Sequence, residues 1–167
     1  PTERLMLGDI HELDGTPWSC CTRSILKAAI ARLERVANLR AVAAFEHEFQ
    51  FRTAPLGTGH AYGYAGFAAR RGYGEALCAA LRSAGIVPDT FMKEYGPEQY
   101  EVTIEPAFAL QAADAAVLLR EIARLTARAQ GEDVTFTPIR DPASVGNGVH
   151  VHLSLVDQDG RPATWSP

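Results

Sequence analysis

Several glutamates lie in segments whose alternation of residue types predicts β-strands, where carboxylates are uncommon. Glu46 and Glu48 belong to one such segment, and Glu101 and Glu105 belong to another. Because residues i and i+2 of a strand share a face, Glu46 and Glu48 point to the same side of the sheet, about 7 Å apart. Glu94 precedes the turn that leads to Glu101. Like charges at this spacing repel each other unless solvent or a cation lies between them.

His150 and His152 share a face of the last predicted strand in the same way. Carboxylates and a histidine gathered on strands form an oxygen-rich site, which suits the hard divalent cations Mg²⁺ and Mn²⁺. Zinc is disfavoured because no cysteine lies near these residues in the sequence. For each residue taken alone, a solvated strand face is the alternative. Such a face would also carry Lys or Arg, and none lies among Glu46, Glu48 and Gln50.

Two kinds of metal site could contain these residues, a cupin-like site and a phosphoryl-transfer site, and the spacing disfavours the first. A cupin-like site built on His150 and His152 would need a glutamate about four residues later, where the chain has Val156-Asp157 and then a turn. The other is a phosphoryl-transfer site, in which metal ions hold the phosphates of ATP. No G-x-x-x-x-G-K-[ST] motif is present, so any use of ATP would depend on metals held by the carboxylates.

The elements that position these residues alternate between helical and strand periodicity. Apolar residues recur at steps of three and four in the predicted helices 24–37, 73–83 and 110–129. In the longest helix, the predicted apolar stripe comprises Leu110, Ala113, Val117, Leu118, Ile122 and Leu125. Strands are predicted at 40–51, 90–95, 99–105, 134–137 and 149–156. The glycine-rich segment 53–66 is predicted to be a functional loop.

Hairpin-like neighbours among these strands predict the α+β class, with an antiparallel sheet whose outer face is covered by helices. The length of 167 residues fits one domain, and 47% hydrophobic with 22% charged residues is typical of a globular protein. A net charge of −4 argues against nucleic acid as a partner, and no apolar run approaches the ~18 residues of a membrane span. Cys20, Cys21 and Cys78 are expected to be reduced thiols of a cytoplasmic protein.

Three segments carry a resemblance to a known family. Residues 45–51 read FEHEFQF, residues 94–101 read EYGPEQYE, and residues 146–155 read GNGVHVHLSL. In order and approximate spacing they resemble the E-x-E-F strand, the H-E-x-x-P-G-Q-x-E ribbon and the N-G-x-x-H-x-H-x-S-L strand of the glutamine synthetase catalytic domain. The resemblance extends from about Leu5 to Leu155 and implies a curved antiparallel sheet.

The resemblance implies a role for each matching residue. Glu48, Glu94 and Glu101 match three carboxylates that hold a first Mg²⁺ or Mn²⁺ ion. Glu46 and His150 match two ligands of a second ion, which lies nearer the phosphates of ATP. Neutralisation of charge on the transferring phosphoryl group is the task that this implies for the metals. From strand parity, we expect all five side chains to converge on one face of the sheet, with the helices 24–37 and 110–129 on the other.

Three further residues match positions that contact substrates. Gly146 matches backbone that contacts glutamate, and His152 and Ser154 match positions near the nucleotide. No residue is assigned as a catalytic nucleophile or base. The family's reaction implies that the γ-carboxylate of glutamate is phosphorylated by ATP, after which ammonia or an amine displaces phosphate. The family also implies a homo-oligomer.

The departures from the family's pattern concern mainly the acceptor. Lys93 stands where ammonia-using members usually have His, and Glu98 stands where the family has Gly. Segment 21–23 reads CTR in place of the family's CPR, and segment 145–146 reads VG at the usual Asn-Gly place. Segment 94–97 resembles members that γ-glutamylate amines or polyamines. The acceptor amine is therefore left open.

The family has a β-grasp domain before the position of Leu5 and an Arg-rich R-x-E-x-R stretch after that of Leu155, and neither is found in this sequence. Residues 1–167 are therefore expected to be the N-terminal part of a catalytic domain, inactive alone. Two functions stay open, a part of a γ-glutamyl ligase and a non-catalytic binding or assembly module. A hydrolase is disfavoured, because no G-x-S-x-G is present and no His lies near Cys20-Cys21.

Overall fold

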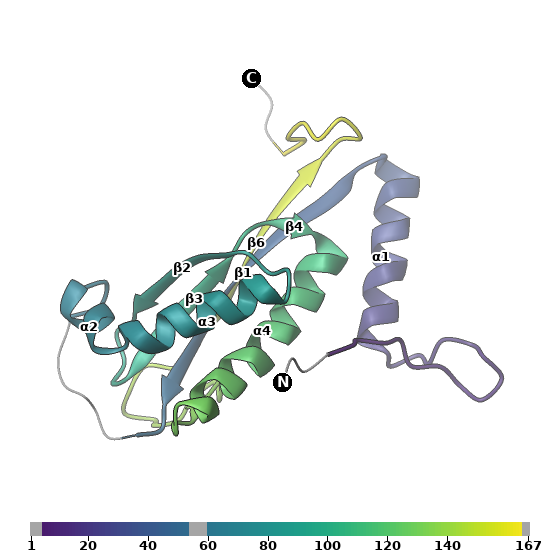
Figure 1. Ribbon diagram of the computed structural model, residues 1–167. Helices are drawn as coiled ribbons and strands as arrows, with labels where there is room; N and C mark the ends of the chain where they lie inside the picture. The colour runs from purple at the N-terminus through teal and green to yellow at the C-terminus, as the bar shows by residue number, and fades with distance from the viewer. Residues whose placement is uncertain (1–4, 54–59, 165–167) are drawn as a thin grey trace. The chain divides into compact units, whose positions relative to one another are not determined.

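The computed structural model describes residues 5–53 and 60–164 (Figure 1). Helices and strands alternate along them. In chain order the elements are α1 (Thr22–Ala37), β1 (Arg40–Phe51), α2 (Tyr64–Ala69), α3 (Arg71–Ser83), β2 (Pro88–Lys93), β3 (Gln99–Ile104), β4 (Ala107–Phe108), α4 (Ala109–Ala129), β5 (Val134–Thr135) and β6 (Val149–Val156). The predicted α+β class is confirmed, because helices accompany an open, antiparallel sheet.

The sheet has the strand order β2-β3-β1-β4, and β5 and β6 also pair with β1. The long strand β1 has the predicted bounds of 40–51, and β6 has the predicted bounds of 149–156. Because β1 pairs antiparallel with β3, Glu46 faces Thr103, Glu48 faces Glu101, and Gln50 is opposite residue 99. Opposite residues in such a pair share a face of the sheet, so this register brings the carboxylates of the two strands together.

The chain divides into two compact units, to both of which β1, α4 and β6 contribute residues. The larger unit comprises Ala44–Glu105 and Ala115–Val151, and contains the core and the candidate ligands. The smaller unit comprises Pro1–Ala43, Pro106–Asp114 and His152–Pro167.

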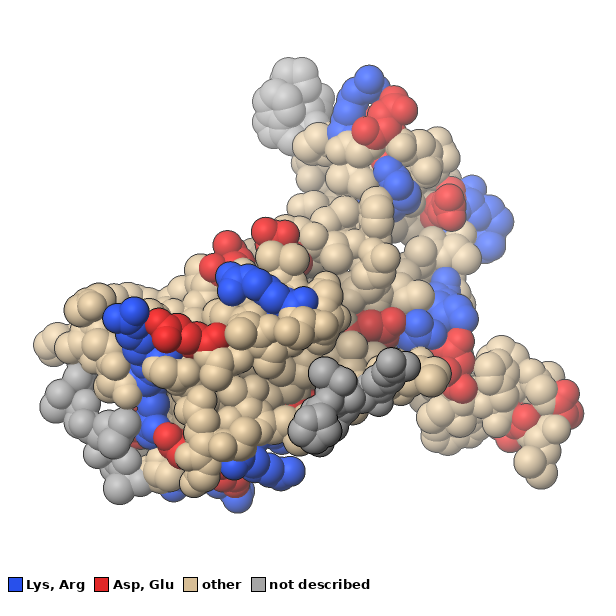
Figure 2. Space-filling view, viewed as in Figure 1, with Lys and Arg blue, Asp and Glu red and all other residues tan. Residues whose placement is uncertain are grey.

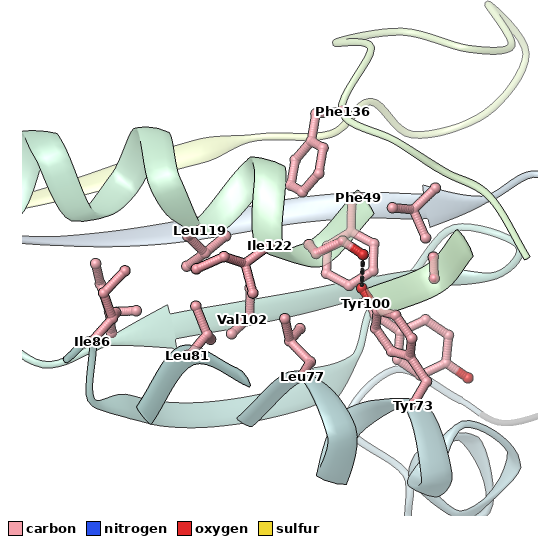
Figure 3. Packing of buried hydrophobic residues seen from close by; sticks show 14 of the residues in the cluster. Phe49, Tyr73, Leu77, Leu81, Ile86, Tyr100, Val102, Leu119, Ile122 and Phe136 are labelled. Carbon is pink, nitrogen blue, oxygen red and sulfur yellow. Dashed lines mark hydrogen bonds between the residues drawn. The ribbon is translucent and has the colours of Figure 1, made fainter. Parts of the chain in front are cut away.

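The core of the larger unit lies on the face of β1 and β3 opposite the glutamates. Its strand residues alternate with the polar ones, and its helix residues come from α3 and α4 (Figure 3). Members of the core are Phe49, Phe51, Tyr73, Leu77, Leu81, Tyr100, Val102, Ile104, Leu119, Ile122 and Ala123. The hydroxyl of Tyr73 donates to the carbonyl of Ala123, which is the dashed line in Figure 3 and links α3 to α4. Gly74 lets α3 approach β2 closely, since a Cβ there would lie 2.5 Å from the ring of Phe91.

The predicted apolar stripe of the longest helix is partly wrong. Val117 is 51% exposed and Leu125 is 36% exposed, whereas Ala116, Leu119 and Ala123 are buried. Apolar residues lie on several sides of this helix, so periodicity alone left more than one stripe available. The structure turns the alanine-rich side of the helix inward.

Segments 24–37 and 110–129 were predicted to cover the core face, whereas the helix residues of the core come from α3 and α4. Helix α1 has no buried residue, and α3 covers that face together with α4. Within the smaller unit, Arg23 of α1 instead forms ion pairs with Asp9 and Asp114. The guanidinium of Arg40 lies 4.6 Å from the ring centre of Phe108, and donates to the backbone carbonyl of Asp157.

Three further local features differ from expectation or extend it. The predicted loop 53–66 is interrupted by α2, which begins at Tyr64, while its residues 54–59 lie outside the described part of the chain. The two-residue strand β4 was not predicted. All three cysteines carry free thiols, as expected. Among the described residues, no helix is both long and apolar enough to cross a membrane.

Charged side chains are spread over the surface that Figure 2 shows, with basic and acidic groups interspersed. Such mixing agrees with the modest net charge of −4. The face shown therefore has no broad basic surface of the kind that binds a nucleic-acid backbone.

Candidate metal site

Strand pairing brings three of the predicted ligands into one cluster. Glu46 comes from β1, Glu101 from β3 and His150 from β6, and one ligand atom from each lies within 4.8 Å of the others. The Nδ1 atom of His150 lies 3.2 Å from Glu46 Oε2 and 4.0 Å from Glu101 Oε2. These distances leave space for a cation that draws the three groups together.

Glu48 lies on the same face, directly opposite Glu101, and is held by hydrogen bonds. The side-chain amide of Gln99 lies 2.9 Å from Glu48 Oε2, and the backbone N–H of Gly148 donates to the same oxygen at 2.9 Å. In addition, the backbone N–H of Glu48 donates to the carbonyl of Gly148. These contacts fix the orientation of the carboxylate before any ligand binds.

Glu94 follows β2 and is buried. Burial raises the pKa of its carboxyl group, and the negative charge of Glu48 raises it further. The adjacent Lys93 is also buried, and its Nζ donates to the carbonyls of Glu94 and Gly96. Lys93 therefore fixes the backbone of the turn that presents Glu94.

The electrostatics of the cluster favour a bound cation. Glu101 is only 6% exposed, and its burial, with the charges of Glu46, Glu94 and Glu48, raises its pKa to about 7. A carboxyl group with this pKa is partly protonated at neutral pH, because the surrounding charge is not compensated. The two carboxylates and the imidazole of the cluster, with Glu48 and Glu94 nearby, are a donor set that fits Mg²⁺ or Mn²⁺.

The geometry groups the residues differently from the family's pattern. The resemblance placed Glu101 with Glu48 and Glu94, whereas the closest cluster contains Glu101 with Glu46 and His150. The expected convergence on one face holds for the residues of β1 and β3, because Glu48 and Glu101 are opposite each other. The assignment of individual residues to two metal ions stays a prediction.

The segment of Gly146, Asn147 and Gly148 packs against residues 137–138. Its Asn147 donates from its backbone N–H to the carbonyl of Pro138 at 2.7 Å. A Cβ at Gly146 would lie 2.5 Å from that same carbonyl oxygen, so glycine is required there. The carbonyl of Gly146 lies 2.7 Å from the side-chain amide of Gln99. The predicted contact of Gly146 with glutamate stays a prediction.

His152 and Ser154 lie on β6 within the smaller unit, and both are exposed. The nucleotide-binding role that the resemblance implied for them stays a prediction.

Sequence reasoning missed the residues that support the ligands. The sequence patterns gave Gln99 no role, although its side-chain amide contacts both Glu48 and the carbonyl of Gly146. Lys93 was noticed only as a departure from the family pattern. The sequence did offer one signal, a polar side chain inside a predicted strand next to the turn. If such a side chain is buried, it is expected to form hydrogen bonds.

Comparison with known protein families gives one strong match. The model of "Glutamine synthetase, catalytic domain" matches residues 19–167. A glutamate–isopropylamine ligase of Pseudomonas sp. is 29% identical over 177 residues, which cover 97% of this chain and 38% of the relative. A gamma-glutamylpolyamine synthetase of Streptomyces coelicolor is 31% identical over 149 residues, which cover 84% of this chain and 32% of the relative.

A solved structure described as a novel glutamine synthase homolog matches with a TM-score of 0.88 and 43% sequence identity. The match covers 96% of this chain and 38% of the solved chain. The chain thus spans less than two-fifths of the length of these relatives. The family-model match covers most of the sequence, and the solved homologue shares its fold. The chain therefore belongs to the glutamine synthetase catalytic-domain family.

Proposed function

We propose that the protein containing this chain is an ATP-dependent ligase that joins the γ-carboxyl group of glutamate to an amine or to ammonia. The observation that carries the proposal is the convergence of Glu46, Glu101 and His150 from three strands. Glu48 and Glu94 lie close enough to raise the pKa of Glu101 by their charge. Relatives named as isopropylamine and polyamine ligases support this reaction class.

In this proposal, Glu46, Glu101 and His150, together with Glu48 and Glu94, hold divalent cations. Bound Mg²⁺ or Mn²⁺ would neutralise negative charge on ATP and on the phosphoryl group as it moves to glutamate. Transfer to the γ-carboxylate oxygen releases ADP and leaves a γ-glutamyl phosphate. Attack by the amine nitrogen on the carbonyl carbon of this acyl phosphate then expels phosphate and forms the amide, with loss of a proton from nitrogen.

The chain's own residues orient this chemistry. Gln99 and the N–H of Gly148 hold Glu48 in place, so little reorganisation is needed when charge develops nearby. Gly146 would present its backbone to glutamate, while His152 and Ser154 would lie near the nucleotide. A homo-oligomer and a cytoplasmic location complete the proposal.

Phosphate release by the full-length protein tests the proposal. It would be measured with ATP, Mg²⁺ and glutamate, in the presence of ammonia, methylamine, isopropylamine or putrescine. We expect release that requires glutamate and at least one of these acceptors. Replacing Glu101 by Gln keeps the size of the side chain but removes a ligand charge, and should lower kcat about 100-fold.

Glu105→Gln is the matched control. Glu105 follows β3 and is exposed, so this variant should keep its activity. Binding of Mn²⁺, measured by electron paramagnetic resonance, should weaken in Glu101→Gln but not in Glu105→Gln. A folded full-length protein that binds Mn²⁺ but releases no phosphate with any acceptor would indicate a non-catalytic binding or assembly module instead.

A further inference from the structure

Tyr62 and Tyr95 form an exposed aromatic pair beside the candidate metal site. Their rings meet edge to face, with centroids 5.6 Å apart and an interplanar angle of 88°. Tyr62 is 62% exposed and Tyr95 is 71% exposed, and neither belongs to the core of the larger unit. The pair therefore offers aromatic surface to a ligand.

One carboxylate of the candidate site lies next to this pair. Tyr95 directly follows Glu94, and its backbone N–H donates to Glu94 Oε2 at 3.2 Å. Aromatic carbon and carboxylate charge are thus presented together.

The backbone holds both tyrosines in place. Tyr62 has φ = 61°, a left-handed conformation that non-glycine residues rarely adopt, and its N–H donates to the carbonyl of Lys93 at 2.8 Å. The Nζ of the same lysine donates to the carbonyls of Glu94 and Gly96, on either side of Tyr95. One buried residue therefore anchors the segments that carry the two rings.

We propose that Tyr62 and Tyr95 bind the hydrocarbon part of an organic ammonium ion and thereby select substituted primary amines over ammonia. The inference rests on the proposed ligase function and names the acceptor class of that site. The charge of a protonated amine is attracted by the faces of the aromatic rings, whose surfaces also contact its carbon atoms. Ammonium has no carbon atoms to contact, so the rings favour the substituted amine.

Kinetics with the full-length protein test this selectivity. The ratio of kcat/KM for isopropylamine to kcat/KM for ammonia would be measured in the wild type, Tyr95→Ala and Tyr95→Phe. Tyr95→Ala should lower the ratio about tenfold or more, a range typical of losing apolar contacts in a binding pocket. Tyr95→Phe keeps the ring and should keep the ratio within about twofold of the wild type.

Tyr64→Ala is the control for loss of an exposed tyrosine. Tyr64 is 76% exposed on α2, and the centroid of its ring lies 6.2 Å from that of Phe67. The Tyr64→Ala variant should therefore leave the ratio unchanged. An unchanged ratio in Tyr95→Ala, or a wild type that accepts ammonia alone, would overturn the inference. Circular dichroism of each variant would establish that it is folded.

Binding without turnover separates this inference from the proposed function. Saturation-transfer NMR with isopropylammonium would be recorded on the wild type and Tyr95→Ala, in the absence of ATP. We expect transfer to the methyl groups in the wild type and its loss in the variant. If the wild type shows this binding but releases no phosphate, only the ligase function fails. Equal transfer in both proteins, or none in the wild type, overturns the inference.

Discussion

The two faces of strands β1 and β3 are built from alternate residues of the same segments, yet they contribute differently to the protein. On one face, Phe49, Tyr100 and Val102 are buried and pack against α3 and α4. On the other face, Glu46 and Glu101 lie close together, and burial together with the charge of Glu46 raises the pKa of Glu101. The first face stabilises the fold by removing apolar surface from water, and that stability offsets the repulsion on the second.

The largest expected effect is on the apolar face. Leu119→Ala should lower the free energy of unfolding by about 2–5 kcal/mol, because Leu119 is fully buried and its loss leaves a cavity. Val117→Ala, two residues away on the same helix, should change it by less than about 0.5 kcal/mol, since Val117 is 51% exposed. Urea unfolding followed by circular dichroism measures both. A larger loss in Val117→Ala than in Leu119→Ala would mean that α4 packs with the side predicted from sequence.

The next effect concerns the charged face and its dependence on pH. The pKa of Glu101, about 7 in the folded protein, is above its unfolded value of 4.5. The folded state therefore holds a proton that the unfolded state releases, and metal-free stability should fall between pH 5 and pH 8 by up to about 3 kcal/mol. Glu101→Gln should remove most of this fall, whereas Glu105→Gln should not.

Mn²⁺ should oppose the same fall. A cation that binds the folded state stabilises it, and this stabilisation should grow as pH rises and Glu101 loses its proton. Thermal unfolding at pH 5 and pH 8, with and without millimolar Mn²⁺, gives the four values required. A midpoint that does not respond to Mn²⁺ at pH 8 would contradict the interpretation of these carboxylates as metal ligands.

The smallest effect on stability is expected at Lys93, a buried charged residue that pairs with Tyr100 across β2 and β3. Lys93→Met removes the donor to the carbonyls of Glu94 and Gly96 but also removes a buried charge, whose burial lowers the pKa of Lys93. The two changes partly cancel, so we expect a net loss of about 1–2 kcal/mol by urea unfolding. Lys27→Met, in which a half-exposed ion pair with Asp9 is lost, should cost less than about 1 kcal/mol. A larger loss in Lys27→Met would reverse the ranking.

Residue alternation in the sequence determined which side chains share a face of each strand. The bounds of β1 and β6 were predicted correctly, and Glu46 and Glu48 alternate with residues of the other face, of which Phe49 and Phe51 are in the core. These features are local, because successive side chains of a strand must point to opposite faces whatever packs against them.

Tertiary structure alone decided which faces meet. The register that sets Glu48 opposite Glu101, the side of α4 that turns inward and the meeting of Tyr62 with Tyr95 join residues far apart in the sequence. Each depends on how side-chain volumes fit across elements, which periodicity along one element does not contain. Alternation in the sequence therefore determined the faces on which the candidate ligands lie, and packing between distant segments decided which of them converge.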